Sequence, residues 1–220
     1  MRRDEAIRTY KVRRRITAGQ ADALGRLLPR FGADVAFDRD APLVLEIGSG
    51  MGEATAAMAA ADPDRNVLAV EVHTPGVGAL LRRLEELGLT NVRVTEADGL
   101  DVLRAFASRS LAEVRVFFPD PWPKARHHKR RLMTSAFADL VADRLSLDGR
   151  LHLATDSRSN AEQARSVLTT HRLLELTSTD RGSRPVTRFE QQGLDAGRPP
   201  YDLVARLRSP GSPPARTVGA

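Results

Sequence analysis

Short apolar runs rich in β-branched residues alternate with helical stripes of apolar residues along most of the chain. The runs predict buried strands, and apolar residues three or four positions apart predict the inward face of a helix. The predicted strands are 43–47, 66–72, 91–95, 114–118, 150–154, 173–177 and 201–207, and the predicted helices are 17–28, 53–61, 75–87, 99–107, 133–145 and 157–168. This alternation indicates an α/β fold with a doubly wound, mainly parallel sheet in a single domain.

The last two predicted strands are joined by a long connection, roughly residues 178–200, that contains no obvious helix. Connections longer than about 12–15 residues within a compact domain are usually functional or disordered. We therefore expect this connection to contribute to a binding site, with a structureless loop as the alternative.

The segment 114–131, VRVFFPDPWPKARHHKRR, combines an acid, an aromatic ring and a cluster of cations. Its apolar start predicts a strand that Pro119 ends, so Asp120 lies at the carboxyl end of that strand. Ligands bind at this edge of open α/β sheets. Trp122 can either stack a base or support the loop. Each feature also has an ordinary structural explanation: a turn, a core residue and a solvated loop.

The charge of the chain changes this picture, because its cations are clustered. There are 34 Lys and Arg against 28 Asp and Glu, for a net charge of +6, and the cations gather in residues 124–131 and 1–15. Clustered cations suit a phosphate backbone. We expect residues 1–40 to form a basic arm and a short helix within the same domain, 41–208 the main body, and 209–220, rich in Pro, Gly and Ser, a disordered tail.

Some classes of protein are excluded by composition. The chain has no cysteine, which excludes disulfides, thiolate zinc sites and cysteine nucleophiles and suits a cytoplasmic location. No apolar stretch is long enough to span a membrane or to form a signal peptide, so we expect no membrane association. His127 and His128 lack a companion ligand cluster, and we expect no metal.

A glycine-rich loop follows the first predicted strand and precedes a helix. It reads EIGSGMG over residues 46–52, which is E-x-G-x-G-x-G and not the dinucleotide fingerprint G-x-G-x-x-G. Glu53 stands where the third dinucleotide glycine would fall, and its carboxylate would repel a pyrophosphate. A cofactor without phosphate therefore fits better, and S-adenosylmethionine is such a cofactor. The pattern resembles the first motif of Rossmann-type methyltransferases.

Acids end the next two predicted strands as well. Glu71 ends the second strand, where a carboxylate can accept both ribose hydroxyls, and Asp98 follows the third. Each acid alone is unremarkable, but acids at three successive strand ends, with Glu46 on the first, strengthen the prediction of an S-adenosylmethionine site.

At this point nearly the whole chain resembles the tRNA (guanine-N7)-methyltransferases of the bacterial single-chain type. The matching segments are EIGSGMG at 46–52, EVHTPGVG at 71–78, FFPDPWPKARHHKRR at 117–131, ATD at 154–156 and SRPVTRFE at 183–190. The PDPW-x-K segment is the most specific of these. The resemblance implies a Rossmann-like sheet of about seven strands, with the last strand antiparallel and helices on both faces.

The resemblance also implies roles for individual residues. Asp120 would be the active-site acid, with a possible contact to the cofactor. The implied cofactor-binding residues are Glu46, Gly48, Gly50, Glu71 and Asp98; the substrate-binding residues are Lys124, Asp156, Thr187, Arg188, Phe189 and Glu190; and the RNA-binding residues are Arg126, His127, His128, Lys129, Arg130 and Arg131. Two positions depart from the family: Pro123 replaces a common His, and Arg188 replaces a common Lys. For Asp156 the alternative is an ordinary helix N-cap.

The implied reaction is methyl transfer to N7 of a guanosine in the variable loop of tRNA, by a monomer or a homodimer. N7 carries a lone pair, so no strong base is needed, and Asp120 would stabilise the positive charge that develops on the purine. An amino methyltransferase acting on another RNA base is one alternative, although Asp120 lies between two prolines and not before them. A non-catalytic RNA-binding protein with the same fold is the other.

Overall fold

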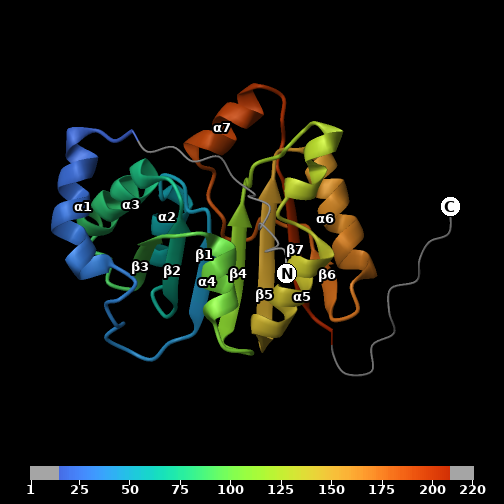
Figure 1. Cartoon of the computed structure of the whole chain (residues 1–220), viewed down its shortest axis with the longest axis horizontal. Helices are drawn as coiled ribbons and strands as arrows, with labels where there is room; N and C mark the ends of the chain where they lie inside the picture. Colours follow the sequence, from blue (N-terminus) through green and yellow to red (C-terminus); the bar gives the residue numbers. More distant parts are fainter. Residues whose placement is uncertain (1–14, 209–220) are drawn as a thin grey trace, which may run out of the picture.

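The computed structural model describes residues 15–208, and these residues form one seven-stranded sheet (Figure 1). The strand order is β3-β2-β1-β4-β5-β7-β6, with β7 antiparallel to both of its neighbours and the other pairs parallel. The strands are β1 Leu43–Ile47, β2 Asn66–Glu71, β3 Val92–Glu96, β4 Leu111–Phe117, β5 Leu145–Thr155, β6 Leu174–Ser178 and β7 Tyr201–Leu207. The predicted α/β class and the antiparallel last strand are confirmed.

Helices cover both faces of this sheet because each face presents its own apolar cluster. The helices are α1 Ala18–Phe31, α2 Glu53–Ala61, α3 Thr74–Glu86, α4 Gly99–Ala105, α5 Ser135–Arg144, α6 Arg158–Thr170 and α7 Arg188–Asp195, with a 3-10 helix η1 at Ala125–Arg130. On one face, apolar residues of α4, α5 and α6 pack on β1, β4, β5 and β7; on the other, those of α1 and α3 pack on β1, β2 and β3. In Figure 1, α4, α5 and α6 lie in front of the sheet, and α7 lies beyond the tip of the β4 arrow.

The ends of two helices differ by a few residues from the predicted ranges. The first helix is predicted over 17–28, ending near Pro29 and Gly32, and α1 continues through Pro29 in its last turn and ends at Phe31, with Gly32 as its C-cap. Burial of Leu27 and Phe31 offsets the hydrogen bond that proline removes. The third helix, predicted over 75–87, spans Thr74–Glu86, and its N-cap His73 makes no side-chain cap bond.

The long connection between β6 and β7 is not structureless. It contains α7, whose N-cap is Thr187, and the Thr187 hydroxyl accepts a hydrogen bond from the Glu190 backbone N–H at 3.2 Å. The helix is too short to show apolar periodicity in the sequence. The predictions for the basic arm, up to residue 14, and for the tail at 209–220 lie outside the described residues. No helix within residues 15–208 combines the length and apolar character needed to cross a membrane.

Candidate active site

A cavity of about 630 Å³ opens at the carboxyl edge of the sheet, where the loops after β1, β2, β3 and β4 meet α7. The chain reverses its direction of travel across the sheet between β1 and β4, which is the switch point where α/β proteins bind ligands. Of the residues predicted for the site, nine line this cavity: Glu46, Gly48, Gly50, Glu71, Asp98, Asp120, Thr187, Arg188 and Phe189. The fold therefore brings together side chains from five separate segments.

The glycine loop leaves its backbone open toward the cavity. Gly48 and Gly50 have φ angles of +79° and +56°, in the left-handed region that favours glycine. An added Cβ at either position would have no other heavy atom within 4 Å. A ligand can therefore approach the main chain directly here, as the sequence motif predicts.

Glu46 lies buried at the floor of the cavity with one oxygen unsatisfied. Its Oε1 accepts a hydrogen bond from the Thr55 hydroxyl at 2.8 Å, whereas Oε2 has no partner among the described residues. Burial raises the pKa of Glu46, and the nearby Arg115 and the Thr55 hydroxyl oppose that rise. Buried carboxylates are normally paired, so Oε2 of Glu46 is available to bind a cationic group or a hydrogen-bond donor of a ligand. The amino group of S-adenosylmethionine fits that requirement.

Glu71 is held in one orientation at the end of β2. Its Oε1 accepts hydrogen bonds from the backbone N–H groups of Val72 at 2.7 Å and His73 at 2.9 Å, and its Oε2 accepts one from Gly50 at 2.6 Å. These bonds fix the carboxylate before any ligand arrives. Three of the roughly four lone-pair sites of the carboxylate are thereby used, and the remaining site, on Oε2, can accept a ribose hydroxyl group.

Asp98 follows β3 and caps α4. Its Oδ1 accepts a hydrogen bond from the Leu100 backbone N–H at 2.8 Å, so the other oxygen remains available toward the cavity that Asp98 lines. The helix capping was not predicted, but it is compatible with an adenine contact because it uses one oxygen.

The turn that carries Asp120 contains unusual backbone. Phe118 has φ +52° and Trp122 has φ +41°, and positive φ is a true outlier for bulky residues. The Phe118 N–H donates to the Ala154 carbonyl at 2.7 Å, which holds the turn at the end of β4. Asp120 is half-buried and lines the cavity. Backbone strain at such a position is typical of functional sites.

Trp122 supports the loop and is not positioned as a stacking platform. Its side chain is 7% exposed and lies outside the cavity lining. The Arg130 guanidinium sits 4.2 Å from the ring centroid, and His127 packs edge-on at 5.8 Å. Of the two roles open at the sequence level, the structure favours support for η1.

The predicted RNA-binding residues differ in exposure. Arg126 and Lys129 are exposed, as is the predicted substrate residue Lys124, and His127, His128 and Arg130 are half-buried. Arg131 is instead only 4% exposed, which departs from the expected role in binding RNA. It donates to the Pro121 carbonyl, to the Ser159 carbonyl and hydroxyl, and to Gln163 Oε1, at 2.9–3.2 Å. Arg131 therefore ties the basic loop to α6.

Two predicted substrate residues are engaged with the protein itself. Glu190 is 2% exposed and pairs with Arg181 and Arg184, so it faces away from solvent. Asp156 accepts a hydrogen bond from Arg198 Nε at 3.1 Å. The alternative role of Asp156 as an N-cap is wrong, because Ser157 caps α6. Lys124, Asp156 and Glu190 do not line the cavity.

Sequence reasoning missed two residues that shape the cavity. Arg184 lines it from a fully buried position. Glu53, considered only as an obstacle to phosphate, accepts a hydrogen bond from the Arg188 backbone N–H at 2.7 Å and pairs with Arg83 at 3.2 Å. It thereby fastens the start of α7 over the cavity. No local signal could reveal a contact that spans 135 positions.

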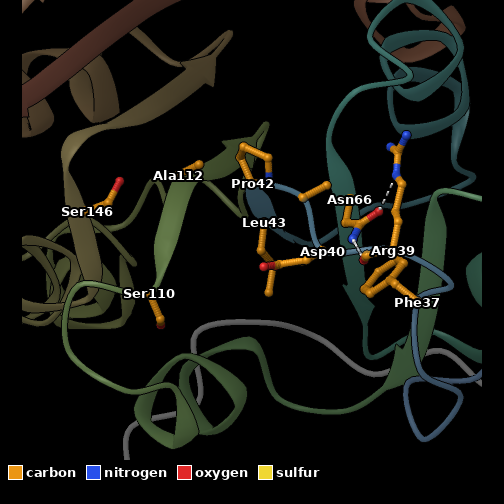
Figure 2. A pocket seen from close by; sticks show the side chains of 10 residues that line it. Phe37, Arg39, Asp40, Pro42, Leu43, Asn66, Ser110, Ala112 and Ser146 are labelled. Carbon is orange, nitrogen blue, oxygen red and sulfur yellow. Dashed lines mark hydrogen bonds between the residues drawn. The ribbon is translucent and has the colours of Figure 1, made fainter.

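A second cavity, of about 890 Å³, lies at the opposite end of the sheet beside the start of β1 (Figure 2). Asn66 and Arg39 in its wall are bonded to each other: the Asn66 side chain accepts from Arg39 Nε at 3.4 Å and donates to the Arg39 backbone carbonyl at 3.2 Å. None of the predicted site residues lines it. Within the described residues, no cluster of three or more His, Cys, Asp or Glu side chains could hold a metal ion. The cavity at the carboxyl edge is therefore the candidate active site.

Solved structures of low sequence identity share the fold. Precorrin-6y C5,15-methyltransferase from Geobacter metallireducens superposes with a TM-score of 0.54 at 16% identity, covering 86% of this chain and 87% of that one. An rRNA methylase from Streptococcus thermophilus gives 0.52 at 16% identity, covering 89% and 99%. At this identity the likeness establishes the Rossmann-like methyltransferase fold alone.

Sequence relatives are much closer. A family described as putative methyltransferase matches residues 40–203. The chain is 49% identical to tRNA (guanine-N(7)-)-methyltransferase of Streptomyces avermitilis, covering 94% of this chain and 77% of that protein. It is 45% identical to the protein of the same name from Nitrosospira multiformis, covering 92% and 95%. With this likeness over most of its length, and with the predicted acids gathered in one cavity, the chain belongs to the tRNA (guanine-N7)-methyltransferase family.

Proposed function

We propose that this protein transfers the methyl group of S-adenosylmethionine to N7 of a guanosine in the variable loop of tRNA. The observation that carries the proposal is one cavity that joins the unsatisfied carboxylate of Glu46 to the half-buried Asp120. The first can pair with the cofactor's amino group, and the second lies at the end of β4, beside the switch point. The family relatives bear the name of the same activity.

The cofactor would be held by residues that the glycine loop and the strand ends already fix. Glu46 would bind the amino group, Glu71 a ribose hydroxyl and Asp98 the adenine amino group, with Gly48 and Gly50 giving the cofactor access to the backbone. When bound, S-adenosylmethionine supplies a methyl group on a positively charged sulfur. The three carboxylates complement a ligand that is cationic at neutral pH.

Asp120 would act by electrostatic stabilisation and not as a strong base. N7 of guanine already has a lone pair, so no proton must leave before attack. Methylation places positive charge on the purine, and a carboxylate at the cavity stabilises that charge more in the transition state than in the ground state. Asp120 can also orient the base by accepting hydrogen bonds from its N–H edge.

The target base would enter beside α7. Phe189 is 52% exposed and packs against Phe118 with ring centroids 5.2 Å apart, so its outer face can stack a purine. Thr187 and Arg188 line the same edge of the cavity. The exposed Lys124, Arg126 and Lys129 would bind phosphates of the RNA around the target nucleotide. Such a substrate, together with the lack of cysteine, fits an enzyme of the cytoplasm.

The test is methyl transfer from labelled S-adenosylmethionine to unmodified tRNA, followed by nucleoside analysis. We expect 7-methylguanosine at one position of the variable loop. Methylated adenine or cytosine would instead support an amino methyltransferase, and cofactor binding without transfer to any base would support a non-catalytic RNA-binding protein.

The assignment of Asp120 is tested separately by Asp120→Asn, with Asp101→Asn on the exposed side of α4 as the matched control. We expect kcat to fall on the order of 100-fold for Asp120→Asn, as for other lost transition-state contacts, with a smaller change in cofactor Kd. Asp101→Asn should keep the parent rate. Equal rates for Asp120→Asn and the parent would refute the assignment.

A further inference from the structure

Arg184 is a fully buried cation placed between β7 and α7. Its Nε and Nη2 donate to the two carboxylate oxygens of Asp202 at 2.8 and 2.7 Å, and its Nη1 donates to Glu190 Oε2 at 2.5 Å. Asp202 belongs to β7 and Glu190 to α7. The planar fork of arginine therefore fixes both the distance and the angle between the last strand and the helix.

The same guanidinium lies under the turn that carries Asp120. Its central carbon is 5.2 Å from the ring centroid of Phe118 and 5.5 Å from that of Phe117. Phe118 is the residue with positive φ two positions before Asp120, and its ring also meets Phe189 of α7. One side chain thus contacts both halves of the proposed substrate site.

A further buried contact holds Asp202, the partner of Arg184, from β5. His152 on β5 bonds through Nε2 to Asp202 Oδ1 at 2.9 Å, and its ring packs edge-on against Phe117 at 5.0 Å. Burial alone would raise the pKa of Asp202, but hydrogen bonds from His152 and Arg184 lower it to about 2. Asp202 is therefore a permanent anion opposite Arg184 at physiological pH.

Stability alone gives no reason for this arrangement. Desolvating a buried ion pair costs several kcal/mol per ion, and well-packed apolar side chains often stabilise a fold as well or better. An ion pair does impose a fixed geometry, which apolar packing does not. The ion pairs of Arg184 with Glu190 and Asp202, together with its contact to the Phe118 ring, hold one guanidinium against both the strained turn and the short helix.

We propose that Arg184 is a positioning residue for methyl transfer. It sets the Asp120 turn, through Phe118, and the substrate segment 187–189, through Glu190, in one relative geometry. The inference rests on the proposed function, since it assigns those two segments to the acid and to the target base. A misplacement of about 1 Å between such groups can cost 100-fold in rate.

The test compares Arg184→Lys with Arg93→Lys. Lysine keeps the charge at position 184 but cannot bond Asp202 in a bidentate manner and Glu190 at once. Arg93 is a matched control, because it is 5% exposed and donates to the backbone carbonyls of Val35, Ala36 and Thr90, far from the cavity. Both variants should lower Tm. Only Arg184→Lys should lower kcat, by about 10- to 100-fold per folded molecule, while the Kd for S-adenosylhomocysteine stays within about twofold.

Hydrogen–deuterium exchange supplies a readout that does not depend on activity. In Arg184→Lys, peptides covering 117–122 and 187–195 should both exchange faster. If Arg184→Lys fails to fold, Phe118→Leu takes its place. This variant keeps the ion pairs of Arg184, and it should speed exchange in 117–122 and lower kcat. The proposal is overturned if Arg184→Lys loses no more kcat than Arg93→Lys, or if only 187–195 loosens. A parent enzyme that forms no 7-methylguanosine would instead refute the proposed function, and the positioning role with it.

Discussion

Replacing Gly76 by alanine should damage the cofactor cavity although no ligand-binding side chain is itself replaced. Gly76 lies in the first turn of α3, and a Cβ there would come within 2.4 Å of the Gly50 carbonyl oxygen and 3.0 Å of Glu71 Cγ. Both neighbours belong to the cavity wall. Because the first contact is with backbone, no side-chain rotation can relieve it, and the glycine loop must move away from α3.

The magnitude follows from what that movement breaks. Overpacking of this kind costs about 1–3 kcal/mol of folding free energy, which lowers Tm by roughly 2–10 °C for a chain of this size. This movement breaks the hydrogen bond from the Gly50 N–H to Glu71 Oε2, which is 2.6 Å long in the parent. A hydrogen bond to a charged group contributes about 1.5–3 kcal/mol. We therefore expect cofactor affinity to fall about 10- to 100-fold.

The assay is calorimetric titration of S-adenosylhomocysteine into the parent, Gly76→Ala and Gly25→Ala. Gly25 also lies within a helix, but an added Cβ there has nothing within 4 Å. Gly25→Ala should raise stability by about 0.5–1 kcal/mol and leave Kd unchanged. If Gly76→Ala binds as tightly as the parent, the glycine loop and Glu71 do not form the cofactor site.

Two further outcomes follow from the charges around the site. Arg131→Met should lower Tm because it removes the four hydrogen bonds of a buried side chain. Lys129→Met should leave Tm unchanged and reduce the salt slope of tRNA binding by about one, as measured by filter binding. The second outcome concerns folding stability at low pH. Since the folded-state pKa of Asp202 is lowered to about 2, its contribution of about 2 kcal/mol is present above pH 4 and is lost as pH falls from 4 to 2. Denaturant titrations should show the stability gap between the parent and Asp202→Asn closing over that interval, and a constant gap would contradict it.

The parts of the site that the sequence predicted share one physical origin. Glu46, Glu71 and Asp120 each lie on or just beyond a strand of the parallel part of the sheet, and the carboxyl ends of parallel strands meet at one edge. Once the alternation of strands and helices is recognised, their meeting follows from topology alone. The glycine loop could also be predicted, because its positive φ angles favour glycine.

The parts that the sequence did not predict depend on three-dimensional packing. Lys129 and Arg131 are two positions apart in one basic run, yet their environments differ. Lys129 in η1 is exposed to solvent, whereas Arg131, the C-cap of η1, is buried against α6. The role of Glu53 depends on Arg188, which folds back over it from the far end of the chain. Trp122 was ambiguous because burial, and not residue type, decides whether an aromatic ring can accept a base.

The position of β7 in the sheet also bears on how the protein folds. β6 hydrogen-bonds to β7 alone within the described sheet, and β7 inserts between β5 and β6 although it comes last in the chain. Until β7 inserts, β6 cannot pair with a strand and Arg184 cannot form its ion pair with Asp202. Strand pairings between distant segments form slowly, because the chain loses conformational entropy before the new contacts stabilise it. The first four parallel strands can therefore assemble a cofactor cavity early, while the substrate side closes only when the final strand is in place.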